Sequence, residues 1–248
     1  MTDSAFSVLT GIDLKRAAML FDVDGTLIDI GPSPFEVDVP PDLKDSLLRL
    51  LDKADGAVAL VSGRPIRDLD VLFTPLELPA IGGHGAEIRL RPGQTLERTS
   101  DINPDLRKRL IEATQGDPRL LYEDKGYSVA LHFRKAPERE AALRTHVQAT
   151  LAAFPNETVE VLPGKAIIEV KQPGISKGRA VRGLVQRPPF KGRMPVFIGD
   201  DVTDQSVFAI MPELGGVNFS VSREFPGVQH VFRSPADVRR ALVVMAAT

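Results

Sequence analysis

Two acidic motifs in this sequence have the residue types and the spacing that metal-assisted phosphate chemistry requires. Each motif directly follows a short apolar run, and together they contain five aspartates: Asp22, Asp24, Asp200, Asp201 and Asp204. Carboxylates that lie within a few ångströms of one another repel, which raises their pKa unless a cation lies among them. Oxygen ligands with no histidine or cysteine nearby suit a hard cation, and among such cations we expect Mg²⁺.

A serine and a lysine elsewhere in the chain could add phosphate-binding groups to these carboxylates. Ser62 follows the apolar run 57–61 and offers a hydroxyl donor, and Lys177 stands at the start of a predicted helix. Both groups suit phosphate oxygens. Each feature also has an ordinary explanation: Ser62 could lie in a simple turn, Lys177 could be solvated, and Asp200 could cap a helix. Their occurrence together in one order favours a phosphate site.

The apolar runs that precede these polar residues predict buried strands of a parallel sheet. The runs occupy 17–21, 57–61 and 195–198, and amphipathic stretches that predict helices lie between them. Strands that alternate with helices pair in parallel through right-handed crossovers. Because the carboxyl ends of parallel strands meet at one edge of the sheet, we expect the polar residues to converge there. The sequence therefore predicts an α/β fold with a Rossmann-like parallel sheet.

A second pattern interrupts the α/β pattern after about residue 80. Two predicted helices alternate there with two predicted hairpins, whose turns lie at 124–126 and 163–164. Turn-forming residues between alternating apolar residues are typical of hairpins. This succession predicts a small α+β unit inserted into the α/β domain. We expect a discontinuous core of residues 1–101 and 173–248, with an inserted α+β cap of residues 102–172.

Composition and charge argue against several other kinds of function. The formal net charge of -2 predicts no polyanion-binding surface, so we expect no nucleic-acid partner. The absence of cysteine excludes disulfides, thiolate nucleophiles and cysteine-ligated metals. The first residues contain neither a basic nor a long apolar segment, so we expect no signal peptide, no membrane partner and a cytoplasmic location. We also expect a monomer.

The ordered motifs resemble those of the haloacid-dehalogenase superfamily of phosphatases. The resemblance rests on Asp-Val-Asp-Gly-Thr at 22–26, then Ser62, Lys177 and Gly-Asp-Asp-Val-Thr-Asp at 199–204. It covers the whole predicted core. It implies the Rossmann-like core of that superfamily, with an α+β cap between the serine and lysine motifs, and Mg²⁺-dependent hydrolysis of a phosphate monoester.

The resemblance, together with the chemistry of each group, implies a role for the motif residues. Asp22 would be the nucleophile that forms an aspartyl-phosphate. Asp24 would protonate the leaving sugar oxygen and then deprotonate the attacking water. Thr26 would help to hold this geometry through its hydroxyl. Ser62 and Lys177 would bind the oxygens of the transferred phosphoryl group.

The same resemblance implies which protein groups would hold the metal ion. Asp22, the backbone carbonyl of Asp24, and Asp200 would be the protein ligands. Asp201 and Asp204 would lie beyond the ligands and orient them.

A finer resemblance is to the trehalose-6-phosphate phosphatase family, which implies trehalose 6-phosphate as the substrate. It rests on Leu-Val-Ser-Gly-Arg-Pro at 60–65, Gly-His-Gly-Ala-Glu at 83–87, Glu-Asp-Lys-Gly-Tyr-Ser-Val-Ala at 123–130, Glu-Val-Lys at 169–171 with Ser-Lys-Gly at 176–178, and the acidic motif at 199–204. Gln205 departs from the pattern, because the family often has glutamate there. We expect little effect, because this position would lie beyond the metal ligands.

By the same resemblance, six residues are expected to contact the sugar phosphate: Arg64, His84, Glu87, Arg89, Lys165 and Glu169. For His84, the alternative is a histidine packed within a loop. Lys165 and Glu169 lie four residues apart, so a strand would place both side chains on one face. A surface ion pair between these two residues is the alternative.

Three other functions fit the same architecture. A phosphatase for another sugar phosphate, such as sucrose phosphate or mannosyl-phosphoglycerate, would differ in its cap residues. A sensor that binds a sugar phosphate without turnover would be expected to lose Asp22 or Asp24, and this sequence keeps both. A phosphomutase would need to reorient a bound intermediate, and nothing in the sequence indicates this.

Overall fold

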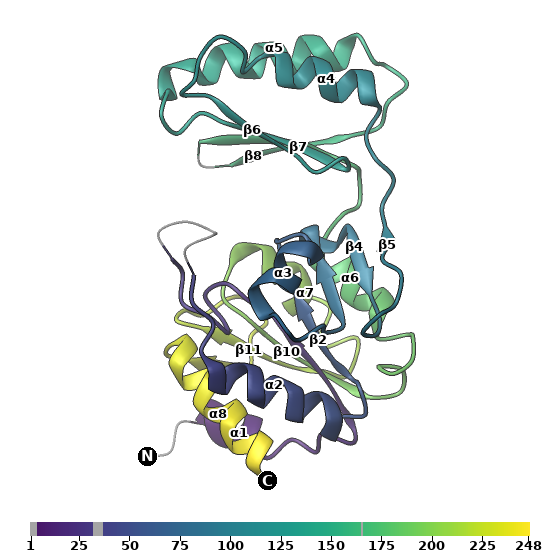
Figure 1. The fold of residues 1–248 in the computed structure, drawn as a ribbon, viewed down its shortest axis with the longest axis vertical. Helices are drawn as coiled ribbons and strands as arrows, with labels where there is room; N and C mark the ends of the chain where they lie inside the picture. The colour runs from purple at the N-terminus through teal and green to yellow at the C-terminus, as the bar shows by residue number, and fades with distance from the viewer. Residues whose placement is uncertain (1–3, 32–36, 165) are drawn as a thin grey trace. The chain divides into compact units, whose positions relative to one another are not determined.

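The structure, a computed structural model, describes residues 4–31, 37–164 and 166–248. The chain divides into two compact units, which we call the larger unit (Met1–Arg98 with Ser176–Thr248) and the smaller unit (Thr99–Ile175). The predicted insert, 102–172, lies within the smaller unit. Figure 1 shows the elements of both units in chain order.

The larger unit contains an eight-stranded sheet in the order β12-β11-β10-β1-β2-β3-β4-β5. Its strands are β1 (Ala17–Phe21), β2 (Val58–Val61), β3 (Ala80–Gly82), β4 (Glu87–Arg89), β5 (Glu97–Arg98), β10 (Met194–Gly199), β11 (Val217–Val221) and β12 (His230–Phe232). The strands from β12 to β3 pair in parallel, and β4 and β5 extend the sheet antiparallel. The mainly parallel sheet confirms the predicted α/β class.

The strand β1 lies between β10 and β2, where its apolar sequence is buried on both faces. Every residue of this strand is inaccessible to solvent. Phe21 pairs with Ile198 of β10 and with Leu60 of β2, so the three strands end close to one level. The residues that follow these strands therefore lie at one edge of the sheet, as the sequence predicts.

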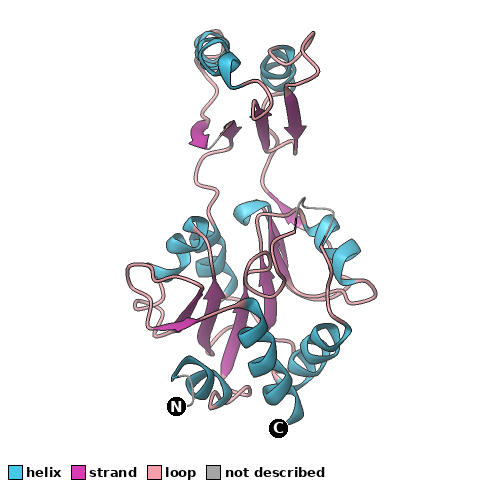
Figure 2. Ribbon diagram, turned by 90° about the vertical axis from the view of Figure 1, so that its left-hand side faces the viewer, coloured by secondary structure: helices cyan, strands magenta, loops and turns pink. Residues whose placement is uncertain are grey.

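Helices pack on both sides of this sheet (Figure 2). The larger unit contains α1 (Ser4–Thr10), α2 (Pro41–Lys53), α3 (Ile66–Phe73), α6 (Lys177–Leu184), α7 (Gln205–Phe208) and α8 (Pro235–Ala247). Helix α8 packs against α1 and α2, and α6 packs against α7. In α2, the leucines at 43, 47 and 50 are buried, which is the spacing of a helix with one apolar face.

The smaller unit is an antiparallel four-stranded sheet with helices on one face. Its strands β6 (Leu121–Asp124), β7 (Ser128–His132), β8 (Glu160–Gly164) and β9 (Ile167–Lys171) pair in the order β6-β7-β9-β8. Side chains from the sheet and from α4 (Pro104–Glu112) and α5 (Glu140–Ala152) form a separate apolar core. The two predicted hairpins therefore form one sheet through the pairing of β7 with β9.

Within the described part of the chain, no helix has the length and the apolar character needed to cross a membrane.

Candidate active site

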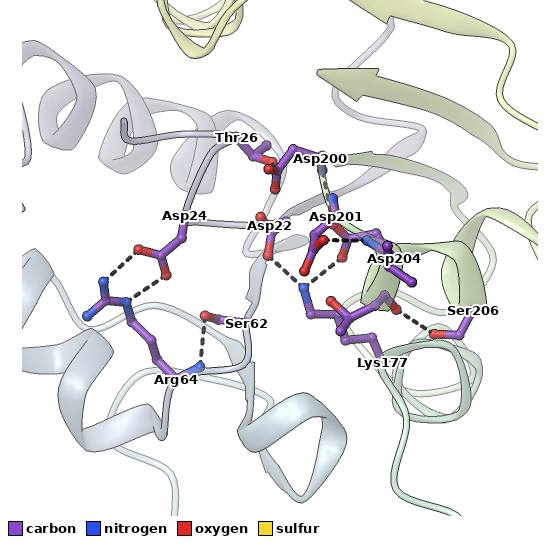
Figure 3. Close-up of polar contacts among 12 residues, drawn as sticks. Asp22, Asp24, Thr26, Ser62, Arg64, Lys177, Asp200, Asp201, Asp204 and Ser206 are labelled. Atoms are coloured by element: carbon purple, nitrogen blue, oxygen red, sulfur yellow. Dashed lines mark hydrogen bonds and ion pairs between the residues drawn. The ribbon is translucent and has the colours of Figure 1, made fainter. Parts of the chain in front are cut away.

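Three carboxylates meet at the carboxyl edge of the parallel sheet in the larger unit (Figure 3). Asp22 directly follows β1, and Asp200 and Asp204 follow β10. One oxygen from each of the three lies within 4.8 Å of the other two. This group could hold a metal ion, and its oxygen ligands suit a hard cation.

Lys177 joins two of these carboxylates. Its Nζ lies 2.7 Å from Oδ1 of Asp22 and 2.7 Å from Oδ1 of Asp204, and its side chain is only 3% exposed. Lys177 is the first residue of α6, and the side chain of Ser176 caps this helix by accepting the N–H of Arg179. Burial opposes the charge of Lys177, but the two aspartates outweigh this effect and raise its pKa above the usual value. The site therefore contains a fixed cation beside Asp22.

The loop after β10 presents Asp200 and holds Asp204 in place. Oδ2 of Asp204 accepts the backbone N–H groups of Asp200 and Asp201, each at 3.0 Å. A Cβ at Gly199 would lie 2.6 Å from the carboxyl carbon of Asp204, so this close approach requires glycine. Asp201 instead accepts the N–H of the next residue at 2.6 Å and pairs with Arg223 at 3.2 Å. Asp204 thus belongs to the group of three carboxylates, whereas the contacts of Asp201 stabilise the loop.

The loop after β1 approaches the carboxylate of Asp200 closely. Gly25 has a φ of +81°, and a Cβ at this position would lie 2.2 Å from Oδ2 of Asp200. Only glycine meets both requirements without strain. The buried hydroxyl of Thr26 donates to Oδ1 of Asp200 at 3.4 Å. The glycine and the threonine of the first motif therefore fix the position of Asp200.

The side chain of Asp24 lies outside the group of three carboxylates and contacts Arg64. Nε of Arg64 donates to Oδ2 of Asp24 at 2.7 Å, and Nη2 donates to Oδ1 at 2.6 Å. The backbone N–H of Arg64 donates to Oγ of Ser62 at 3.1 Å. Ser62 is almost fully buried, and accepting this bond leaves its own hydroxyl proton to be donated.

The segment 83–87 holds the loop that carries Ser62 and Arg64. The N–H of His84 donates to the carbonyl of Ser62 at 3.0 Å, and the N–H of Gly83 donates to the carbonyl of Arg64 at 2.8 Å. The imidazole of His84 lies against Gly63, where a Cβ would come within 2.4 Å of the ring. His84 is half-buried beside Gly63, and its contact with substrate stays a prediction.

Glu87 and Arg89 have partners other than the sugar contacts expected from the sequence. Glu87 is buried, and its Oε2 accepts the N–H of Ile66 at the start of α3 at 2.7 Å. Arg89 is also buried and donates to the carbonyl of Leu78 at 3.0 Å and to both oxygens of Asp70, at 2.6 and 2.8 Å. Both side chains therefore connect elements around the site, and their contact with the sugar phosphate stays a prediction.

The remaining two expected sugar contacts belong to the smaller unit. Glu169 lies on β9, half-buried, between Ile168 and Val170, which pack into the apolar core with the helices. Because strand residues alternate between faces, Glu169 lies on the face of the sheet away from the helices. Lys165 lies outside the described residues.

Two residues around the site were not singled out in the sequence. Ser206 accepts the N–H of Gly178 at 3.1 Å, and a Cβ at Gly178 would lie 2.1 Å from the carbonyl oxygen of Ser206. Arg223 donates to the carbonyl of Asp200 at 3.2 Å. The glycine next to Lys177 was the one available signal of a close approach, and no pattern marks Ser206 or Arg223.

Burial disfavours the ionised form of each of the three carboxylates. It raises the pKa of Asp22, Asp200 and Asp204 to about 6 in each case. Repulsion within the group adds to this effect, because Asp22 raises the pKa of Asp204, and Asp204 raises that of Asp200. A cation among the three oxygens would remove the repulsion, so the residues present fit a hard metal ion.

The raised pKa values predict that these three carboxylates lower the stability of the metal-free protein as pH rises. Between pH 3.8, the ordinary pKa of an aspartate, and about 6, the unfolded chain releases these protons before the folded chain does. The carboxylates therefore favour unfolding increasingly across this window. We expect Asp200→Asn, relative to wild type, to gain free energy of unfolding from pH 4 to pH 7 in the presence of a chelator. Urea denaturation at each pH measures this difference.

The matched control for this measurement is Asp29→Asn, whose carboxylate is exposed and pairs with Arg239. It should show no such gain, and saturating Mg²⁺ should reverse the advantage of Asp200→Asn. A difference between Asp200→Asn and wild type that stays constant with pH would contradict the expectation.

Comparison with known proteins identifies relatives over most of the chain. A family model described as trehalose-phosphatase matches residues 20–240. The trehalose-6-phosphate phosphatase of Escherichia coli (strain K12) is 40% identical over 208 residues, which cover 83% of this chain and 77% of that protein. A probable trehalose-phosphate phosphatase of Sinorhizobium fredii is 37% identical over 239 residues, which cover 95% and 89%.

Solved structures share the fold at lower identity. The C-terminal domain of trehalose-6-phosphate phosphatase from C. albicans has a TM-score of 0.73 at 21% identity and covers 99% of this chain and 97% of that chain. A haloacid dehalogenase-like hydrolase from Bacteroides thetaiotaomicron has a TM-score of 0.66 at 13% identity, covering 94% and 99%. These similarities confirm the haloacid-dehalogenase-like fold class. The match of the family model and the identity to two relatives show that this chain belongs to the trehalose-phosphatase family.

Proposed function

We propose that this protein is a phosphatase that hydrolyses trehalose 6-phosphate to trehalose and inorganic phosphate, with Mg²⁺ as its cofactor. The observation that carries the proposal is the group of Asp22, Asp200 and Asp204, two of which pair with Lys177, in a chain that the family model matches over 20–240. Carboxylates and a buried cation at one sheet edge supply the groups that phosphoryl transfer needs.

The first half of the reaction forms a covalent intermediate on Asp22. The oxygen of Asp22 that does not pair with Lys177 attacks phosphorus, the bond from phosphorus to the sugar oxygen breaks, and the carboxyl group of Asp24 gives its proton to that oxygen. Lys177 and the hydroxyl of Ser62 hold the phosphoryl oxygens in line. Asp22, Asp200 and the backbone carbonyl of Asp24 would hold Mg²⁺, which neutralises charge on the phosphoryl oxygens when bound.

The second half of the reaction returns the enzyme to its starting state. Asp24, now a carboxylate, takes a proton from water, and the water oxygen attacks the phosphorus of the aspartyl-phosphate. The bond from phosphorus to Asp22 breaks and inorganic phosphate leaves. Asp204 and Asp201 take no part in these bonds; they orient Asp200 and the loop after β10.

A panel of sugar phosphates tests the function. With Mg²⁺ present, kcat/KM for trehalose 6-phosphate should exceed that for glucose 6-phosphate, sucrose 6-phosphate and mannosyl-3-phosphoglycerate. Phosphate release measures each rate under the same conditions. Equal or higher kcat/KM for another sugar phosphate would reject trehalose 6-phosphate as the preferred substrate.

We also propose that Glu169 contacts hydroxyl groups of the sugar, with Lys165 as a second contact. Loss of a hydrogen bond to a sugar hydroxyl costs about 1–3 kcal/mol, or roughly 5- to 150-fold in kcat/KM. We therefore expect Glu169→Ala to lower kcat/KM for trehalose 6-phosphate by that factor. p-Nitrophenyl phosphate has no sugar, so its hydrolysis should change less than about threefold, a change of roughly 0.6 kcal/mol.

The matched control for Glu169→Ala is Glu138→Ala, because Glu138 also belongs to the smaller unit and is exposed in a pair with Arg119. Both substrates should be hydrolysed normally by this variant. If Glu169→Ala slows both substrates equally, Glu169 supports the fold or the chemistry instead of binding the sugar.

A cytoplasmic location and a monomeric state complete the proposal, with no nucleic-acid or membrane partner. Sedimentation velocity at micromolar concentration tests the monomer, and a dimer there would contradict it.

A further inference from the structure

We propose that Arg64 is a positioning residue that orients Asp24 for proton transfer. The inference rests on the proposed function, because it concerns the proton-transfer step of that reaction. The sequence predicts that Arg64 contacts substrate; in the structure, its guanidinium donates to Asp24.

The guanidinium of Arg64 binds the carboxylate of Asp24 through two hydrogen bonds, a bidentate contact that we call the fork. Nε and Nη2 of Arg64 donate to different oxygens of Asp24, at 2.7 and 2.6 Å. Two parallel hydrogen bonds fix both the place and the plane of a carboxylate, which a single bond from a lysine does not. Without them, the carboxylate plane of Asp24 could turn freely, because the torsion that sets it has only a broad preference.

Arg64 can act as a support because its own backbone is held on both sides. Its N–H donates to Oγ of Ser62 at 3.1 Å, and its carbonyl accepts the N–H of Gly83 at 2.8 Å. Two residues further on, the N–H of Ile66 donates to the buried carboxylate of Glu87 at 2.7 Å. The side chain of Arg64 is 13% exposed, against 35% for the side chain of Asp24. Arg64 therefore joins the more exposed Asp24 to a hydrogen-bonded loop.

The fork leaves Asp24 able to transfer a proton. A carboxylate has about four lone-pair sites, of which Arg64 occupies two, one on each oxygen. A further site on each oxygen remains to carry the proton for the sugar oxygen or to accept one from water. Arg64 contacts both Ser62 and Asp24. It therefore also sets the distance between the hydroxyl of Ser62, which would bind phosphate, and the carboxyl group of Asp24, which would transfer the proton.

Two substrates with different leaving groups distinguish the orientation of Asp24 from other roles of Arg64. A sugar oxygen leaves poorly without a proton, whereas p-nitrophenolate leaves without one. A correctly placed general acid contributes roughly 10²- to 10⁴-fold. We therefore expect Arg64→Ala to lower kcat for trehalose 6-phosphate by about 10²-fold, at the lower end of that range, and to change KM little. The rapid release of p-nitrophenol in the first turnover should remain.

The experiment combines Arg64→Ala, Asp24→Asn and the double variant with two controls. Arg64→Lys keeps the charge but loses the fork, so it should stay close to Arg64→Ala. Arg67→Ala removes an arginine of the next helix whose side chain is 81% exposed, and it should match wild type. In the Asp24→Asn background, Arg64→Ala should cost less than about threefold in kcat, because the two residues act through one step.

Three outcomes would overturn the inference. A raised KM with unchanged kcat for Arg64→Ala would make Arg64 a substrate contact. An equal loss in the Asp24→Asn background would mean that Arg64 acts independently of Asp24. Loss of the first-turnover release of p-nitrophenol would place its effect on Asp22 or on the fold. If wild type leaves trehalose 6-phosphate intact, the proposed function fails, and the comparison proceeds with an alkyl phosphate that is hydrolysed.

Discussion

Asp22→Asn should hydrolyse trehalose 6-phosphate more slowly than wild type by on the order of 10⁴-fold or more, as expected when a nucleophile is removed. The amide oxygen attacks phosphorus poorly and offers a metal ion no negative charge. The amide also replaces the carboxylate that pairs with Lys177 at 2.7 Å. Phosphate release under saturating substrate and Mg²⁺ measures the loss.

The matched control for Asp22→Asn is Asp29→Asn, which removes an exposed carboxylate further along the same loop. This variant should retain wild-type kcat. Thermal unfolding should show that Asp22→Asn is folded, because Lys177 keeps its ion pair with Asp204 at 2.7 Å. A folded Asp22→Asn protein with wild-type activity would exclude Asp22 as the nucleophile.

Removal of divalent cations should abolish phosphate release, and Mg²⁺ should restore it. The physical reason is the group of three buried carboxylates, each with its pKa raised to about 6, which repel when ionised. Ca²⁺ prefers a larger and looser set of ligands, so it should bind and inhibit. Phosphate release after chelation and dialysis, titrated with Mg²⁺, measures the requirement.

A second readout of the metal ion is independent of activity. A ligand that binds only the folded protein, at a concentration of 100 times its dissociation constant, stabilises the protein by about 2.7 kcal/mol. Mg²⁺ should therefore raise the unfolding temperature of wild type. Asp200→Asn should lose most of that rise, and Asp29→Asn should keep it. Full activity after exhaustive chelation would contradict the assignment of Mg²⁺.

The central strands could be predicted because burial on both faces leaves a plain signal in the sequence. β1, β2 and β10 are continuous apolar runs, and polar residues follow each of them. The edge of the sheet gave no such signal. Both residues of β5 are exposed and charged, and the short strand β12 depends on pairing with β11, for example His230 with Phe219. These two strands form because they pair with a neighbouring strand, and their own sequences contain no apolar run that predicts a strand.

The candidate site divides in the same way between local and distant determinants. The motif residues could be found because their chemistry follows directly on the strands that present them. The partners of Arg89 could not, since Leu78 and Asp70 meet it only after β4 pairs with β3 and α3 packs nearby. The fork between Arg64 and Asp24 joins residues 40 positions apart and depends likewise on the order of strands in the sheet.

The most direct test of this account is to trap the covalent intermediate. Trehalose 6-phosphate with a labelled phosphoryl group should be mixed with the enzyme and Mg²⁺ and quenched in acid within one turnover. Peptide mapping is predicted to find the label on the carboxyl group of Asp22 and none after the same treatment of Asp22→Asn. Label on another residue, or rapid phosphate release with no labelled protein at any time, would contradict the aspartyl-phosphate mechanism.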